Sequence, residues 1–250
     1  MLKYWRRLTR PYMRALERRY RGTRRSIRDD SPPWLRHSAD YVLDRFDLVM
    51  IDHGIFRFIY ANRHKVSDKV WRSAQPAPSD IARFVRRGVR TIVNLRGDRD
   101  CGSYRLEQAA CQRLGVTLLD FKAARSRAAP DRAFFHEAKA LFERVKYPIA
   151  MHCKSGADRV GLMSALYLIF HEGRPVEEAR RQLSIWYGHI KQAETGILDA
   201  VFDSYIAHNK VAPIGFLDWI DNHYDPALLT THFGARRWGN FVVNGILQRE

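Results

Sequence analysis

Short blocks of apolar residues recur through the middle of the chain and predict buried strands. Each block spans four to six residues and is rich in apolar and β-branched side chains, as is typical of strands. The blocks are Val70-Trp71-Arg72-Ser73, Thr91-Ile92-Val93-Asn94-Leu95, Val116–Phe121 and Tyr147-Pro148-Ile149-Ala150. Helical segments separate them, so strands and helices alternate. We therefore predict an α/β fold with a mostly parallel central sheet that is flanked by helices.

Apolar residues at helical spacing predict the other elements. Ser79 is the expected N-cap of the first helix, and Gly88 and Gly115 follow two of the helices as stop signals. The predicted helices cover residues 79–87, 104–114, 131–145, 160–170, 176–186, 198–208, 216–224 and 241–247.

The composition changes near residue 40 and predicts three parts. Residues 29–40 include Ser31-Pro32-Pro33, which indicates a linker after a basic arm. We predict an arm and linker over 1–40, a catalytic domain over 41–210, and a helical extension over 211–250 that packs on the domain.

The overall composition limits the class of protein. At 250 residues with 46% hydrophobic content, the chain is able to bury a sizeable core. Its longest apolar run, near residues 160–170, is far shorter than the about 20 residues that cross a bilayer. Cys101, Cys111 and Cys153 form neither a disulfide framework nor paired metal-ligand spacing. We expect a cytoplasmic protein that needs no metal and no other cofactor.

Positive charge is concentrated at the N-terminus. Residues 1–28 hold eleven Lys or Arg and one acid, Glu17, and so carry ten of the sixteen net positive charges. Apolar residues recur among them at helical spacing. We expect this amphipathic arm to bind an anionic membrane surface on the inner face of a membrane, at about 1 kcal/mol per basic residue. The alternatives are a solvated or partner-bound helix, nucleic-acid contact and a transit peptide; nucleic acid is not the expected partner.

The candidate chemistry lies in Met151-His152-Cys153-Lys154-Ser155-Gly156-Ala157-Asp158-Arg159-Val160-Gly161. This segment joins a predicted strand to a predicted helix, so its backbone N–H groups and the helix dipole favour a bound oxyanion. Arg159 adds a planar two-pronged donor, and the positive field favours the thiolate of Cys153, which can attack phosphorus. The residues expected to surround the phosphate are Lys154, Ser155, Gly156 and Ala157.

The stretch HCKSGADRVG resembles the signature of the cysteine-dependent protein tyrosine and dual-specificity phosphatase superfamily. The segments 70–76 and 91–97 also resemble the opening strands of its bacterial dual-specificity-like members, which extends the likeness to about residues 65–195. The resemblance implies a phosphocysteine intermediate, with Cys153 as nucleophile and Arg159 as the group that binds the phosphoryl oxygens.

Two further arginines are expected near the mouth of the site. Ligands gather beyond the carboxyl ends of parallel strands, where Arg72 and Arg96 are predicted to lie. Arg96 is a candidate second phosphate contact, and pairing with Asp98 or Asp100 is the alternative.

The segment after the catalytic helix is a further candidate. Gln182 and residues 187–191 lie where related enzymes present residues to the site. Packing of a helix that ends at Gly188 is the alternative.

The chain departs from the commonest pattern of the superfamily at two positions. Val160 stands where relatives usually have a Ser or Thr that assists breakdown of the intermediate, and Ser155 is the substitute hydroxyl. The proton donor is either Asp120, at the usual spacing before the cysteine, or Asp158 within the loop, as in myotubularins and some bacterial lipid-directed or broad-specificity phosphatases. Asp158 is the first choice, because the segment after Asp120 lacks the early prolines of the usual acid loop.

We expect a cysteine-dependent phosphomonoesterase. Lys154, Arg72, Arg96 and the basic arm favour a polyanionic substrate, such as an inositol phosphate or a phospholipid head group, including a lipid A-like glycolipid. A phosphotyrosine or dual-specificity protein phosphatase is the first alternative. A phosphate-recognition module without turnover is the second.

Overall fold

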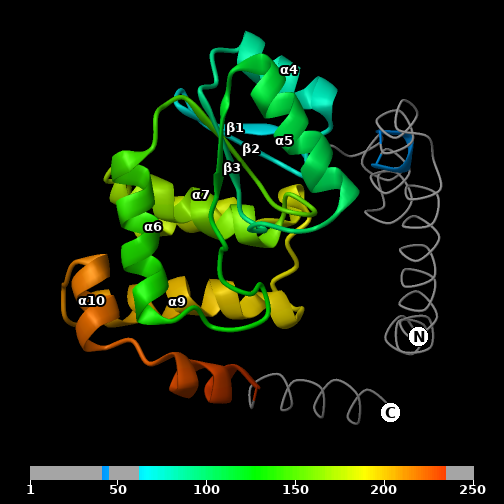
Figure 1. Cartoon of the computed structure of the whole chain (residues 1–250). Helices are drawn as coiled ribbons and strands as arrows, with labels where there is room; N and C mark the ends of the chain where they lie inside the picture. Colours follow the sequence, from blue (N-terminus) through cyan, green and yellow to red (C-terminus); the bar gives the residue numbers. More distant parts are fainter. Residues whose placement is uncertain (1–40, 45–61, 235–250) are drawn as a thin grey trace, which may run out of the picture.

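The computed structural model describes residues 41–44 and 62–234 (Figure 1). The predicted arm and linker over 1–40 and the predicted helix over 241–247 lie outside the described residues. The strands are β1 (His64–Ser67), β2 (Val70–Ser73), β3 (Thr91–Asn94), β4 (Thr117–Asp120) and β5 (Ile149–His152). They form one sheet in the order β1-β2-β5-β3-β4, in which only the β1–β2 pair is antiparallel. The predicted mostly parallel α/β sheet is confirmed, and β1 is an edge strand that the sequence pattern did not indicate.

The helices cover both faces of the sheet (Figure 1). They are α4 (Pro78–Arg86), α5 (Gly102–Leu114), α6 (Arg132–Arg144), α7 (Asp158–Phe170), α8 (Val176–Ala179), α9 (Ile197–Asn209) and α10 (Phe216–Asn222). Residues 226–234 are also helical.

Alternate strand residues serve the two faces. On one face, Ile92 and Ala150 pack with α4 and α5. On the other, Val93 and Met151 pack with α6, α7, α9 and α10. This division follows from the two-residue period of a strand, and it makes β3 and β5 buried on both sides.

Three predicted boundaries are wrong. The N-cap of α4 is Ala77 instead of Ser79, because Pro78 begins the helix and the Asp80 side chain accepts a bond from the Ala77 N–H at 3.1 Å. The strand predicted over 147–150 runs over 149–152; Pro148 has no N–H to give to a ladder.

The third error is the continuous helix predicted over 176–186. It divides into α8, η2 (Arg180–Gln182) and η3 (Ile185–Tyr187). The carbonyl of Gln182 accepts a hydrogen bond from Arg72 at 2.7 Å, and Ser184 is extended with its hydroxyl accepting from the Trp186 N–H. The Gln182 carbonyl and the Trp186 N–H therefore form hydrogen bonds with side chains, and a continuous helix does not form.

Helix α10 belongs to the main core. Phe216, Trp219 and Ile220 are buried in the same cluster as α6, α7 and α9. The boundary predicted at residue 210 stays a prediction. Within the described residues, none of the helices has the length and apolar character needed to cross a bilayer.

Candidate active site

The candidate catalytic loop begins at the carboxyl end of β5 and enters α7. Cys153 follows β5 directly and is 2% exposed, within the same apolar cluster as Val160. Lys154 and Ser155 are exposed, so one side of the loop faces solvent. An anion in this loop would lie at the N-terminus of a 13-residue helix, where unpaired N–H groups and the helix dipole favour negative charge.

Gly156 gives the loop its tight shape. Its φ is +73°, and a Cβ there would lie 2.7 Å from the Ala74 nitrogen and 2.9 Å from the Ser73 carbonyl carbon. Only glycine combines this conformation with so close an approach of two backbone segments. The loop is therefore pressed against the end of β2.

Arg72 supports the loop from inside the protein. It is 0% exposed, and its guanidinium donates to the carbonyls of Gly156 at 2.9 Å and Ala157 at 3.1 Å. The other terminal nitrogen donates to the carbonyl of Gln182 at 2.7 Å and to its Oε1 at 2.8 Å. Carbonyls that accept these bonds turn away from the loop's cavity, which leaves the neighbouring N–H groups to face an anion.

Arg159 lies in the first turn of α7 and reaches across the loop. Its Nη1 donates to the Leu95 carbonyl at 3.3 Å, just beyond the end of β3. The guanidinium thus lies between the loop and the neighbouring strand end. A planar donor placed there can bind two oxygens of one phosphoryl group.

Asp158 is held by a buried histidine. His189 is 1% exposed; its Nδ1 lies 2.7 Å from Asp158 Oδ1 and its Nε2 lies 2.6 Å from Asp199 Oδ2. Burial alone would lower the pKa of His189, but the hydrogen bonds and charges of the two carboxylates outweigh it and raise the pKa to about 9. At neutral pH the imidazole is charged and both of its protons are directed at carboxylates.

Asp120 ends β4 and is exposed. Its Oδ1 accepts from Asn94 Nδ2 at 2.7 Å, and its Oδ2 accepts a bond from the Tyr104 hydroxyl. Burial, together with the hydrogen bond to Asp120, raises the pKa of Tyr104, so this hydroxyl remains a donor. Asn94 pairs in register with both Asp120 and His152, which places Asp120 two strands, or about 10 Å, from the start of the catalytic loop.

Comparison with known proteins identifies the family. A family model described as "DSP-PTPase phosphatase fused to NAD+ Kinase" matches residues 59–195. The chain belongs to this family. The matched residues include the whole sheet, the catalytic loop, α7 and His189.

The chain is also similar to individual phosphatases. The dual specificity protein phosphatase TpbA of Pseudomonas aeruginosa is 31% identical over 122 residues, which are 49% of this chain and 53% of TpbA. The chain thus spans about half the length of the curated relatives that it matches. Among solved structures, P. aeruginosa TpbA (20% identity, TM-score 0.45) is covered to 91% by 70% of this chain. PTPMT1 (20% identity, TM-score 0.44) is covered to 99% by 60% of it.

Arg72 and Arg96 do not both lie where the sequence predicted them. Arg72 is not at the mouth of the site, because it is fully buried beneath the loop. Arg96 is 7% exposed and its Nη1 donates to Gln75 Oε1 at 2.6 Å, whereas Asp100 pairs with Arg105. A phosphate contact by Arg96 stays a prediction.

Gln75 connects Arg96 to the residue before the nucleophile. Gln75 Nε2 donates to Glu107 Oε2 at 2.8 Å. Glu107 Oε1 lies 2.6 Å from His152 Nε2, an electrostatic contact without hydrogen-bond angles. The sequence analysis missed Gln75 and Glu107 as part of the site. The two residues are far apart along the chain, so no local pattern indicates that they form this network.

Of the residues after α7, Gln182 binds Arg72 and His189 binds Asp158. Tyr187 packs its ring under the Arg72 guanidinium at 3.9 Å, and its carbonyl accepts from Asn62 Nδ2 at 2.8 Å. The same Asn62 nitrogen donates to the Ser155 carbonyl at 3.0 Å. This segment therefore supports the catalytic loop.

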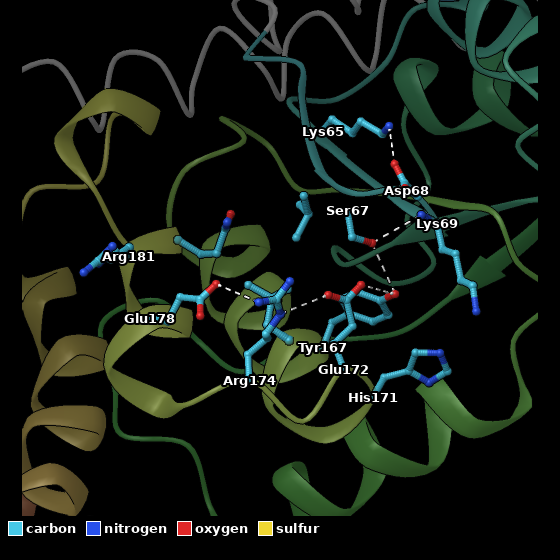
Figure 2. A pocket seen from close by; sticks show the side chains of 13 residues that line it. Lys65, Ser67, Asp68, Lys69, Tyr167, His171, Glu172, Arg174, Glu178 and Arg181 are labelled. Carbon is cyan, nitrogen blue, oxygen red and sulfur yellow. Dashed lines mark hydrogen bonds and ion pairs between the residues drawn. The ribbon is translucent and has the colours of Figure 1, made fainter.

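A separate cavity of about 720 Å³ lies along the other end of α7 (Figure 2). Tyr167 in its wall donates to Glu172 at 3.0 Å and lies 3.3 Å from the Ser67 hydroxyl. Tyr167 is nine residues after Asp158 on the same helix, about 14 Å along its axis. This cavity is thus distinct from the catalytic mouth.

Proposed function

We propose that the chain is a cysteine-dependent phosphomonoesterase. The observation that carries the proposal is the position of Cys153, between the end of a central strand and the N-terminus of α7, with Arg159 one helical position beyond Asp158. The Cys153 thiolate attacks phosphorus, the S–P bond forms, and the bond from phosphorus to the leaving oxygen breaks. Water then cleaves the phosphocysteine and releases phosphate. Arg159 and the loop N–H groups stabilise the charge on the phosphoryl oxygens in both steps.

Asp120 is the proton donor that the geometry favours over Asp158. Asp158 Oδ1 is engaged by the charged imidazole of His189, whose other nitrogen contacts Asp199, so the Asp158 carboxylate already has a structural partner. Asp120 is exposed and is oriented by Asn94 and Tyr104 at the same edge of the sheet. A group there can protonate the leaving oxygen and then accept a proton from the attacking water.

The second step proceeds without a hydroxyl at the usual position. Val160 is 0% exposed and packs in the core, and it has no hydroxyl to offer the nucleophile. Ser155 is on the exposed side of the loop. We assign the substitute hydroxyl to Ser155.

The substrate that we propose is a polyanionic phosphomonoester, such as an inositol phosphate or the head group of a phospholipid or lipid A-like glycolipid. Exposed Lys154 directly after the nucleophile and the net charge of +16 support it, because positive potential concentrates anions at the mouth. A phosphorylated protein is the alternative, supported by the name of TpbA as a dual specificity protein phosphatase.

Phosphate release from inositol phosphates, phospholipid vesicles and phosphotyrosine peptides tests the proposal. We expect turnover of at least one class, highest for the polyanionic substrates, and no turnover by the Cys153→Ser variant, which keeps its affinity for phosphate. Fastest release from peptides would favour the alternative. Binding of phosphate without any release by the wild-type chain would show a recognition module.

A further inference from the structure

Three large apolar side chains are exposed in one short segment next to the catalytic loop. Trp186 is 83% exposed, Ile185 68% and Ile190 49%. Single exposed apolar residues are ordinary on protein surfaces. Among the described residues, however, these three belong to a group of seven large exposed hydrophobics and lie within six positions of one another. We call Ile185, Trp186 and Ile190 the apolar rim.

The exposure of the apolar rim is built into the local backbone. In η3, the Gly188 N–H donates to the Ile185 carbonyl at 2.8 Å and the His189 N–H donates to the Ser184 carbonyl at 3.1 Å. Gly188 ends the turn at a φ of +77°. Tyr187 points inward onto Arg72 while Ile185 and Trp186 point outward. A turn fixed at both ends therefore presents these side chains to the surroundings.

The same turn is attached to the catalytic loop on two sides. Asn62 Nδ2 joins the Tyr187 carbonyl to the Ser155 carbonyl, at 2.8 and 3.0 Å. His189, next to Ile190, holds Asp158. A surface that engages the apolar rim thus lies beside the opening through which substrate reaches Cys153.

The chain segment that carries the apolar rim is positively charged. Residues 180–193 contain three Lys or Arg and no acid. Arg180 and Lys191 share one acidic partner, Asp203, so one positive charge of this pair is in excess. Arg181 and Lys154 are also exposed. Aromatic and aliphatic side chains framed by cations match the interface of an anionic bilayer, where indole rings lie at head-group depth.

We propose that the apolar rim docks this protein on an anionic phospholipid surface with the catalytic loop facing the head groups. The inference deepens the proposed function, on which it rests for the lipid nature of the substrate. It gives the enzyme access to phosphomonoesters at an interface without extracting them into water.

Co-sedimentation with vesicles tests the docking surface. Full-length Cys153→Ser protein is mixed with equimolar phosphatidylcholine and phosphatidylglycerol vesicles, or with phosphatidylcholine alone, at low and high salt. We expect the Ile185→Ala/Trp186→Ala pair to weaken partition to the anionic vesicles about tenfold or more, at both salt concentrations, because the lost term is apolar. The matched control is Val211→Ala/Leu228→Ala, which removes exposed apolar residues elsewhere (88% and 55% exposed) and leaves partition unchanged. Thermal unfolding midpoints check that both variants are folded.

Three outcomes would overturn the docking proposal. The first is that the rim variant and its control bind the vesicles equally well, and the second is that the wild-type protein binds neutral and anionic vesicles equally well. The third is that the wild-type protein self-associates and that Trp186→Ala abolishes this association, which would make the rim a contact between copies of the chain. The binding assay does not depend on hydrolysis. If the wild-type chain binds through the rim but releases no phosphate from any substrate, the proposed function fails and the docking surface stands.

Discussion

His189 Nδ1 lies 2.7 Å from Asp158 Oδ1, so the carboxylate beside the phosphate-binding arginine is part of a buried ion pair. The second imidazole nitrogen lies 2.6 Å from Asp199, in α9. His189 thereby joins the first turn of α7 to α9, since Asp158 lies 31 positions before it in the sequence and Asp199 lies 10 positions after it. We therefore propose that Asp158 is a positioning group and that Asp120 is the proton donor.

Substitution of the two aspartates separates these roles. Asp120→Asn should slow hydrolysis of an alkyl phosphate by about 10²–10³-fold but that of an activated aryl phosphate much less, since a good leaving group needs little protonation. Asp158→Asn should slow both substrates by a similar factor, because it disturbs the loop. Steady-state kcat on the two substrates measures the difference. A leaving-group-dependent loss in Asp158→Asn instead would identify the loop carboxylate as the acid.

The His189 pair also predicts how stability depends on pH. The folded pKa of about 9 lies above the ordinary value of 6.5, so the pair's contribution is fully present below about pH 6.5 and is lost as the pH rises through about 9. The free energy of unfolding in urea should fall over this range by on the order of 3 kcal/mol. His189→Gln should remove that part of the slope.

The control for this prediction is a surface pair of the same chemistry. His136 Nε2 lies 2.7 Å from Asp221, with the two side chains 49% and 44% exposed. His136→Gln should leave the pH slope as in the wild type, since exposed pairs contribute little. If His189→Gln retains the full slope, another group is responsible.

Gly156 should be irreplaceable for activity. Gly156→Ala places a Cβ 2.7 Å from the Ala74 nitrogen and strains a φ of +73°, so the loop has to move. A displacement near 1 Å of a catalytic loop costs roughly 100-fold in kcat. Gly88→Ala is the matched control: its φ is +85°, but a Cβ there meets nothing within 4 Å. Gly88→Ala should lower the free energy of unfolding by about 1 kcal/mol and leave kcat unchanged. If both variants lose kcat equally, the close packing around Gly156 is not the reason for its importance.

Arg72 should matter for phosphate binding although it is remote from the mouth. A lysine cannot reproduce four hydrogen bonds to Gly156, Ala157 and Gln182, so Arg72→Lys should lower stability by about 2–4 kcal/mol and weaken phosphate binding. Calorimetric titration of inorganic phosphate into the Cys153→Ser background measures the second effect. Arg83→Lys, at a 40%-exposed pair with Asp80, should change neither. Unchanged phosphate affinity in Arg72→Lys would contradict the supporting role.

Local patterns predicted most of the fold. Apolar runs placed β2, β3 and β4, and stop glycines placed the ends of α4 and α5, because burial and left-handed backbone act over a few residues. The strand-to-helix setting of the catalytic loop was likewise predictable. Each of these features depends on side chains that are neighbours in sequence.

The remaining features depend on contacts between distant residues. Arg72 was expected at the mouth of the site, yet it is buried, because loop carbonyls 84 and 85 positions later accept its hydrogen bonds. The same guanidinium interrupts the helix predicted over 176–186 by binding the Gln182 carbonyl, 110 positions away. His189 lies in the segment 187–191 that the resemblance indicated, but its partners Asp158 and Asp199 lie on two other helices. The spacing of apolar residues along the chain does not indicate contacts between residues so far apart in sequence.

Helix α7 is apolar on all sides, with residues 162, 163, 165, 166 and 167 each 0% exposed. The backbone amides of these central residues are therefore reachable by solvent only when the core opens, and their hydrogen exchange should report the global unfolding equilibrium. Arg159 lies in the first turn of the same helix, so phosphate recognition should not persist in a partly opened protein. Thermal inactivation of the enzyme and cooperative melting of the domain should then follow a single curve, with no surviving subpopulation that is loosened but active.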